Sequence, residues 1–161
     1  MGVRKAMGNM ASSLSTWGLR HLAHRPAANM PGKIALKIDP RIIAESMDKI
    51  TEGSIVVVGT NGKTTITNMI ADALERQGKS IACNRTGANL AYGVATTLLQ
   101  TKGTVEWGVF ESDELWLAHT LPQVQADYVL LLNLFRDQLD RCSEIDRVQD
   151  AISTALEQPP N

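Results

Sequence analysis

The chain has few aromatic residues, two cysteines and no long apolar run. Aromatic residues make up 4% of its 161 residues, too little for base-stacking platforms, so we expect no nucleic-acid partner. Cys83 and Cys142 are too few and too far apart for a zinc site within this chain. Free thiols suit a reducing compartment, so we expect a cytoplasmic protein. No apolar stretch approaches the ~18 residues that a membrane-spanning helix requires.

The net charge of −1 hides an asymmetry along the chain. Residues 1–38 contain six Lys or Arg and no acidic residue, and the first acid is Asp39. A basic leader on an acidic body is typical of an arm that meets an anionic membrane surface or a partner. A solvated helix that docks on its own domain explains the same charges. We therefore predict a basic N-terminal helix and linker over 1–38 and leave its target open.

The spacing of apolar residues predicts a helix over 5–24 that ends before Pro26 and Pro31. We expect residues 35–38 to be short and extended, and a second helix to begin near Pro40 with Asp39 as its N-cap.

From residue 54 onward, predicted strands alternate with predicted helices. The strands are expected at 55–58, 80–83, 107–110 and 127–132, and the helices at 63–77, 89–99 and 146–156. This alternation predicts an α/β fold, in which helices flank a parallel sheet like that of the P-loop NTPases, preceded by an N-terminal helical leader.

The sharpest motif lies between the first strand and its helix. It reads Gly59, Thr60, Asn61, Gly62, Lys63, Thr64 and Thr65. Glycines let backbone N–H groups face a phosphate, and the helix N-terminus adds its positive dipole end. Lys63 can reach the β- and γ-phosphates, and the Thr64 hydroxyl can bind Mg²⁺. The strict P-loop pattern fails because Val57 stands where its first glycine belongs.

Acidic residues follow the strand 107–110. Carboxylates at this end of a parallel strand lie where α/β sheets bind ligands, and Mg²⁺ beside phosphates needs one or two of them. We favour a metal role for Glu111, nearest the strand, and leave Asp113 and Glu114 open between metal binding and a solvated acidic turn.

Two further segments also follow predicted strands. Residues 133–141 hold acids and arginines that fit metal or phosphate binding, or a salt-bridge network. In residues 84–89, Asn89 can bond phosphate or substrate, or cap the next helix. None of the three histidines has a partner that indicates acid–base catalysis.

The loop Gly59–Thr65 resembles the ATP loop of the Mur ligases and the related folylpolyglutamate synthases, including its late first glycine. Glu111 stands at the position of the family's Mg²⁺-binding glutamate. Residues 133–141 resemble the family's Asn…Asp-His-Leu-Asp stretch, with Gln138 in place of a metal-associated histidine.

Other segments are similar to the Mur ligase-like subunits of enzymes that amidate lipid II. These segments are 26–33, 35–40, 84–89 and 136–141. The resemblance extends from about Leu14 to Asp146.

The resemblance implies an ATP-dependent carbon–nitrogen ligase of peptidoglycan synthesis. ATP would phosphorylate the α-carboxylate of D-glutamate in lipid II, and ammonia from a glutamine amidotransferase subunit would displace the phosphate to give D-isoglutamine. Lys63 and Glu111 would be catalytic, Thr64 and Glu111 would hold Mg²⁺, and Asn89 would join residues 59–65 in binding ATP. The basic leader would be a candidate for contact with anionic lipid headgroups at the inner face of the membrane, with a helix that docks on its own domain as the alternative.

Two alternatives stay open: an amino-acid-adding Mur ligase or folylpolyglutamate synthase, and a nucleotide-binding fragment without ligase activity. The resemblance makes residues 39–161 the N-terminal part of a central ATP-binding domain. Mur ligases continue with more central strands and a C-terminal domain, and the amidating subunits with a four-cysteine zinc module. We therefore expect this chain alone to be inactive and to expose an apolar sheet edge.

Overall fold

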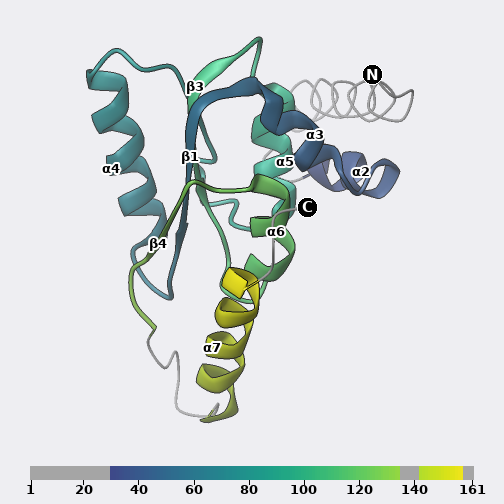
Figure 1. Cartoon of the computed structure of the whole chain (residues 1–161), viewed down its shortest axis with the longest axis vertical. Helices are drawn as coiled ribbons and strands as arrows, with labels where there is room; N and C mark the ends of the chain where they lie inside the picture. The colour runs from purple at the N-terminus through teal and green to yellow at the C-terminus, as the bar shows by residue number, and fades with distance from the viewer. Residues whose placement is uncertain (1–29, 135–141, 158–161) are drawn as a thin grey trace.

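A four-stranded parallel sheet forms the centre of the computed structural model, which describes residues 30–134 and 142–157 (Figure 1). The strand order is β2-β3-β1-β4, and each pair of neighbours is parallel. The strands are β1 (Ile50–Val58), β2 (Ile81–Cys83), β3 (Val105–Glu111) and β4 (Tyr128–Leu131). The predicted α/β fold with a parallel sheet is confirmed.

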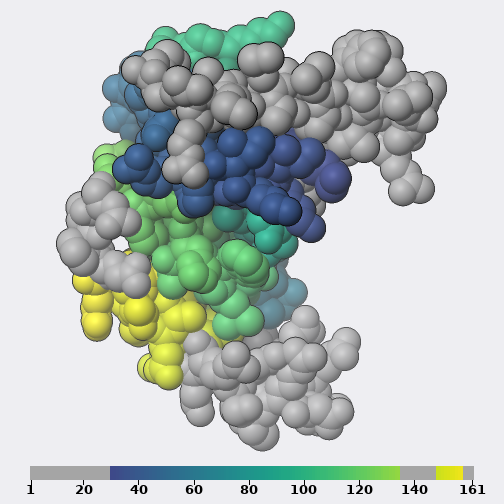
Figure 2. All heavy atoms as spheres, turned by 90° about the vertical axis from the view of Figure 1, so that its right-hand side faces the viewer, coloured from purple at the N-terminus to yellow at the C-terminus, as the bar shows by residue number. Residues whose placement is uncertain are grey.

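Helices cover both faces of this sheet. Helix α4 (Lys63–Arg76) lies on one face, and the remaining helices gather on the other (Figure 1). They are α2 (Met30–Ile38), α3 (Ile42–Ser46), α5 (Ala91–Gln100), α6 (Leu117–Val124) and α7 (Cys142–Glu157), with a 3₁₀ turn at Met47–Lys49. In Figure 2, α2 and α3 lie beside α6, and α7 continues the same surface.

The core forms around β1, the strand that leads into the glycine-rich loop. Val56, Val57 and Val58 are fully buried, as a continuous β-branched run in a sheet with two covered faces requires. Val56 and Val58 pack into the main apolar cluster with Phe110 of β3 and Leu98 of α5. Because side chains alternate along a strand, Val57 faces α4. This burial fixes the end of β1, where the loop begins.

The extended segment expected at 35–38 was wrong, because these residues belong to α2. Pro31 lies in the first turn of this helix, where proline is tolerated because a first-turn residue has no helical partner for its N–H. α2 packs closely on α5 through Gly32, whose backbone N–H donates to Thr96 Oγ1 at 2.8 Å. Asp39 does not cap a helix at Pro40. Its Oδ1 accepts from the Arg41 N–H at 3.1 Å, and α3 begins at Ile42.

Helix α6 was missed by the sequence analysis. Leu117, Leu121 and Val124 are buried at helical spacing, but Pro122 lies inside the helix and masks the pattern. The helix predicted at 5–24 falls outside the described residues. Within the described part of the chain, no helix is long and apolar enough to cross a membrane.

Strand β4 forms one edge of the sheet. No further strand pairs with its outer side within residues 30–134 and 142–157. Tyr128, Leu130 and Leu131 are exposed there, at 60%, 38% and 46% of their surface. The apolar sheet edge expected from the sequence is therefore present among the described strands.

Candidate nucleotide and metal site

The loop after β1 turns sharply into α4, and two glycines make the turn. Gly59 has φ +146°, and a Cβ built there would lie 3.0 Å from the Asn133 carbonyl oxygen. Gly62 has φ +86° and precedes Lys63, the first residue of α4. No side chain caps this helix, so its first backbone N–H groups remain directed at the space in front of the loop.

Asn133 follows the end of β4 and holds the glycine-rich loop there through three hydrogen bonds. Its backbone carbonyl accepts from the Thr60 N–H at 2.9 Å. Its side-chain amide bonds both backbone groups of Asn61. Oδ1 accepts from the Asn61 N–H at 3.0 Å, and Nδ2 donates to the Asn61 carbonyl at 3.0 Å. The loop is thus held from a segment 72 residues away in the sequence.

The Lys63 ammonium folds back over the loop. It donates to the Gly59 carbonyl at 2.5 Å and the Thr60 carbonyl at 3.4 Å. A third contact, at 3.5 Å, is an ion pair with Glu114 Oε1. The side chains of Lys63 and Glu114 are each 12% exposed. The cation therefore stands at the loop, where an anionic group would meet it.

Glu111 lies at the end of β3 and is 1% exposed. Its Oε2 is buried without a hydrogen-bond partner, which is costly for a carboxylate unless a cation is bound there. A Cβ built on Gly87 would lie 3.4 Å from Thr64 Oγ1 and 3.8 Å from Glu111 Oε1. The glycine thus leaves space between the hydroxyl and the carboxylate.

One carboxylate and one hydroxyl are oxygen ligands that Mg²⁺ takes beside phosphate oxygens. The described residues contain no cluster of three His, Cys, Asp or Glu that could hold a metal ion by itself, without phosphate oxygens as further ligands. The unpartnered Glu111 oxygen, the Thr64 hydroxyl and the open space at Gly87 therefore fit Mg²⁺ bound together with a nucleotide.

Most of the residues predicted for ATP and Mg²⁺ line one hollow of about 280 Å³. They are Thr60, Asn61, Gly62, Lys63, Thr64, Thr65, Asn89 and Glu111, with Gly87 added. Gly59 forms the turn behind this hollow. Asn89 is not the cap of α5, since Leu90 holds that position. Part of the candidate segment 133–141 lies outside the described residues, including Asp137, Gln138 and Asp140.

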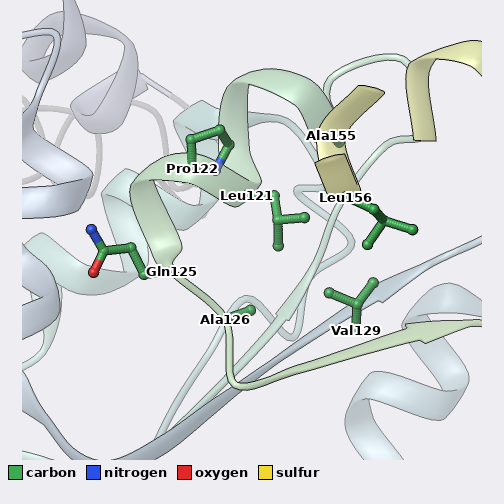
Figure 3. A pocket seen from close by; sticks show the side chains of 7 residues that line it. All are labelled: Leu121, Pro122, Gln125, Ala126, Val129, Ala155 and Leu156. Carbon is green, nitrogen blue, oxygen red and sulfur yellow. The ribbon is translucent and has the colours of Figure 1, made fainter. Parts of the chain in front are cut away.

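A second hollow, of about 400 Å³, lies between α6, α7 and β4 (Figure 3). Among the described residues, its lining consists of Leu121, Pro122, Gln125, Ala126, Val129, Ala155 and Leu156.

The sequence placed Asn133 and Asn84 in candidate segments, but their roles as supports of the loop and of Glu111 were missed. Asn84 is 3% exposed. Its Oδ1 accepts from the Glu111 N–H at 2.9 Å, and its Nδ2 donates to the Glu111 carbonyl at 3.0 Å. Their position directly after predicted strands was the available signal, but their partners are distant in sequence.

The parallel sheet, the glycine-rich strand-to-helix loop and the carboxylate on the adjacent strand define an α/β protein with a loop of the P-loop kind. The family model of the Mur ligase middle domain matches residues 57–160. The chain belongs to the Mur ligase family.

Curated relatives agree with this family. The chain is 33% identical over 163 aligned residues to the lipid II isoglutaminyl synthase (glutamine-hydrolyzing) subunit MurT of Streptococcus pneumoniae, with 99% of the chain and 36% of the relative covered. It is 35% identical over 132 residues to the MurT subunit of Staphylococcus aureus, with 80% of the chain and 29% of the relative covered. The chain thus spans about a third of the length of these relatives.

Solved structures share the fold. A MurF ligase from Thermotoga maritima in complex with ADP has a TM-score of 0.63 at 19% identity, covering 79% of this chain and 29% of that one. MurF from Acinetobacter baumannii also has a TM-score of 0.63, at 23% identity, covering 76% and 27%.

Proposed function

We propose that this chain supplies the ATP- and Mg²⁺-binding part of a ligase that amidates lipid II during peptidoglycan synthesis. The observation that carries the proposal is the site itself: Lys63 at a glycine-rich loop faces a hollow that also contains the buried, unpartnered carboxylate of Glu111. The names of the two MurT relatives point to the amidating reaction.

The proposed reaction solves a chemical difficulty in two steps. A carboxylate is a poor electrophile and must first be activated. An oxygen of the D-glutamate α-carboxylate attacks the γ-phosphorus of ATP, ADP leaves, and the product is an acyl phosphate with a good leaving group. Ammonia then attacks the acyl carbon, phosphate leaves and a proton is lost, which gives the amide of D-isoglutamine. The ammonia comes from glutamine, hydrolysed by an amidotransferase partner subunit.

The residues of this chain act mainly on phosphate charge. The N–H groups at the start of α4 and the Lys63 ammonium bind phosphate oxygens. Lys63 also stabilises the negative charge that develops on the leaving group during transfer. Thr64 and Glu111 hold Mg²⁺, which neutralises phosphate charge when it is bound. Gly87 and Asn89 complete the lining of the hollow. We expect the reaction at the cytoplasmic face of the membrane, where lipid II offers its headgroup.

Nucleotide binding tests the site directly. In the full chain, Lys63→Ala should weaken ATP binding about 10- to 100-fold, since a charge-assisted hydrogen bond contributes roughly 1.5–3 kcal/mol. Lys79→Ala is the matched control, because Lys79 pairs with Glu52 and Glu106 at the opposite end of the strands. Equal ATP affinity in Lys63→Ala and the unmodified chain would refute the site.

The reaction needs its own test, with the chain as part of its complete enzyme. Lipid II, glutamine, ATP and the amidotransferase partner should yield amidated lipid II together with ADP and phosphate.

An amino-acid-adding ligase is the second candidate. The chain is 31% identical over 106 residues to the UDP-N-acetylmuramate--L-alanine ligase of Azorhizobium caulinodans, covering 66% of the chain and 21% of that enzyme. Product formation with a free amino acid, and none with glutamine and the partner, would favour this candidate. Nucleotide binding with neither product would favour a non-catalytic module.

A further inference from the structure

The parallel pairing of β2 with β3 continues beyond the end of the shorter strand, through a side chain. The last backbone pair joins Cys83 to Val109. The next residue, Asn84, then bonds the N–H and the carbonyl of Glu111 through its side-chain amide, at 2.9 and 3.0 Å. A primary amide carries the same acceptor and donor as a peptide group, so it replaces one further step of backbone pairing.

The same amide also bonds the loop that contains Gly87 and Asn89. Asn84 Nδ2 donates a second hydrogen bond to the Ala88 carbonyl at 2.9 Å. Ala88 lies between Gly87 and Asn89, which both line the hollow. One buried side chain therefore holds Glu111 and the loop that faces it at a fixed separation.

Other contacts hold this loop from outside. Arg85 forms ion pairs with Asp72 at 2.6 Å and Glu75 at 2.8 Å on α4, and the Asn89 carbonyl accepts from the Asp113 N–H at 2.8 Å. The Arg85 pairs are partly exposed and contribute little each. The Asn84 bonds are buried, where an unmade hydrogen bond is most costly.

From this geometry we infer that Asn84 is a positioning residue for the metal site. It acts through Glu111: by bonding both backbone polar groups of Glu111, it keeps the carboxylate beside Thr64 and Gly87. The inference rests on the proposed function, because it assumes that Glu111 binds Mg²⁺ together with a nucleotide.

Substitution of Asn84 should alter the Mg²⁺ requirement more than the nucleotide affinity itself. Mg²⁺ is expected to strengthen ADP binding, and the Mg²⁺ concentration that gives half of this effect can be measured in the full chain. Asn84→Ala should raise that concentration about 10-fold or more, which is the usual effect of losing a residue that orients a metal ligand. ADP affinity in EDTA should stay within about twofold, because the loop and Lys63 remain in place.

A matched control separates this effect from lost stability. Thr96 is also buried and makes two side-chain hydrogen bonds, with Gly32 and Tyr92, in the contact between α2 and α5. Thr96→Val should lower the melting temperature and leave the Mg²⁺ dependence unchanged.

Hydrogen exchange tests the contact without a variant. In the unmodified, metal-free chain the backbone amide of Glu111 should exchange as slowly as the paired amides of β3. In Asn84→Ala the same amide should exchange faster. Rapid exchange of the Glu111 amide in the unmodified chain would overturn the inference even if Asn84→Ala does not fold.

The two possible failures are distinguishable. An unchanged Mg²⁺ curve in Asn84→Ala, with a shifted curve in Glu111→Gln, overturns the role of Asn84 alone. Absence of ADP binding in the unmodified chain, with or without Mg²⁺, overturns the proposed function and the inference together.

Discussion

The Lys63 ammonium lies 3.5 Å from the Glu114 carboxylate, and both side chains are largely buried. Under the proposed function, the phosphates of a nucleotide compete with the Glu114 carboxylate for the Lys63 cation. We therefore expect the pair to oppose nucleotide binding.

Removal of that competing charge should strengthen nucleotide binding. We expect Glu114→Gln to bind ATP about 3- to 10-fold more tightly, which corresponds to roughly 1 kcal/mol. Adenosine, which has no phosphate, should bind Glu114→Gln and the unmodified chain equally. Titration calorimetry with both ligands measures the difference, and Glu52→Gln removes the same charge at the far end of the sheet as a control. Weaker ATP binding in Glu114→Gln would instead assign Glu114 a supporting role.

Asn133 should affect nucleotide affinity through the loop. Asn133→Ala removes two hydrogen bonds to Asn61 while the backbone bond to Thr60 stays. Each bond contributes about 1 kcal/mol, and the loosened loop must be ordered again when phosphate binds. The two bonds together correspond to about 2 kcal/mol, so we expect ADP affinity to fall by up to about 30-fold. Unchanged affinity would show that the loop keeps its shape without the side chain.

Glu106 should make stability depend on pH in the acidic range. Hydrogen bonds from the Ser80 backbone, the Lys79 ammonium and the Ser80 hydroxyl lower the pKa of Glu106 from 4.5 to about 2. The ionised form is thus favoured in the folded state, so its contribution is complete above pH 4.5 and is lost as the pH falls towards 2.

A comparison with Glu106→Gln isolates this contribution. The variant should be less stable than the unmodified chain at pH 6, and the difference should shrink steadily between pH 4.5 and 2. Urea unfolding across this range measures it, and a difference that does not vary with pH would contradict the pKa assignment.

Cys83 should react slowly with alkylating agents in the folded chain. Burial raises the pKa of its thiol to about 11, against a smaller opposing effect of Arg85. At pH 8 the reactive thiolate is then about 100-fold scarcer than for an ordinary cysteine thiol. Mass spectrometry of the Cys83 peptide after iodoacetamide treatment should show slow labelling in buffer and fast labelling in urea. Equal rates would mean that the thiol is accessible and normally acidic.

Local patterns were sufficient to predict much of this fold. The β-branched run Val56–Val58, the glycines after it and Lys63 lie within eight residues, so the strand, the turn and the helix follow from short-range rules. The helices α2 and α6 were lost because Pro31 and Pro122 normally indicate helix ends. Pro31 lies in the first turn of α2, where it costs no helical hydrogen bond. Pro122 lies inside α6, and the buried face of that helix is not visible in a local window.

The supporting residues of the site could not be predicted in the same way. Asn84 bonds a residue 27 positions away, and Asn133 one that is 72 positions away. An asparagine after a strand is an ordinary turn residue until the sheet order is known. The order β2-β3-β1-β4 makes both of them neighbours of the residues that they hold.

The strand order also determines what would be needed to graft this site onto another protein. Gly59–Lys63 takes its shape from Asn133, and Glu111 is held in place by Asn84. A graft of the glycine-rich loop alone into a foreign parallel sheet would therefore lack both of these anchors. The smallest transferable unit consists of four adjacent strand ends, each carried with the first residues that follow it.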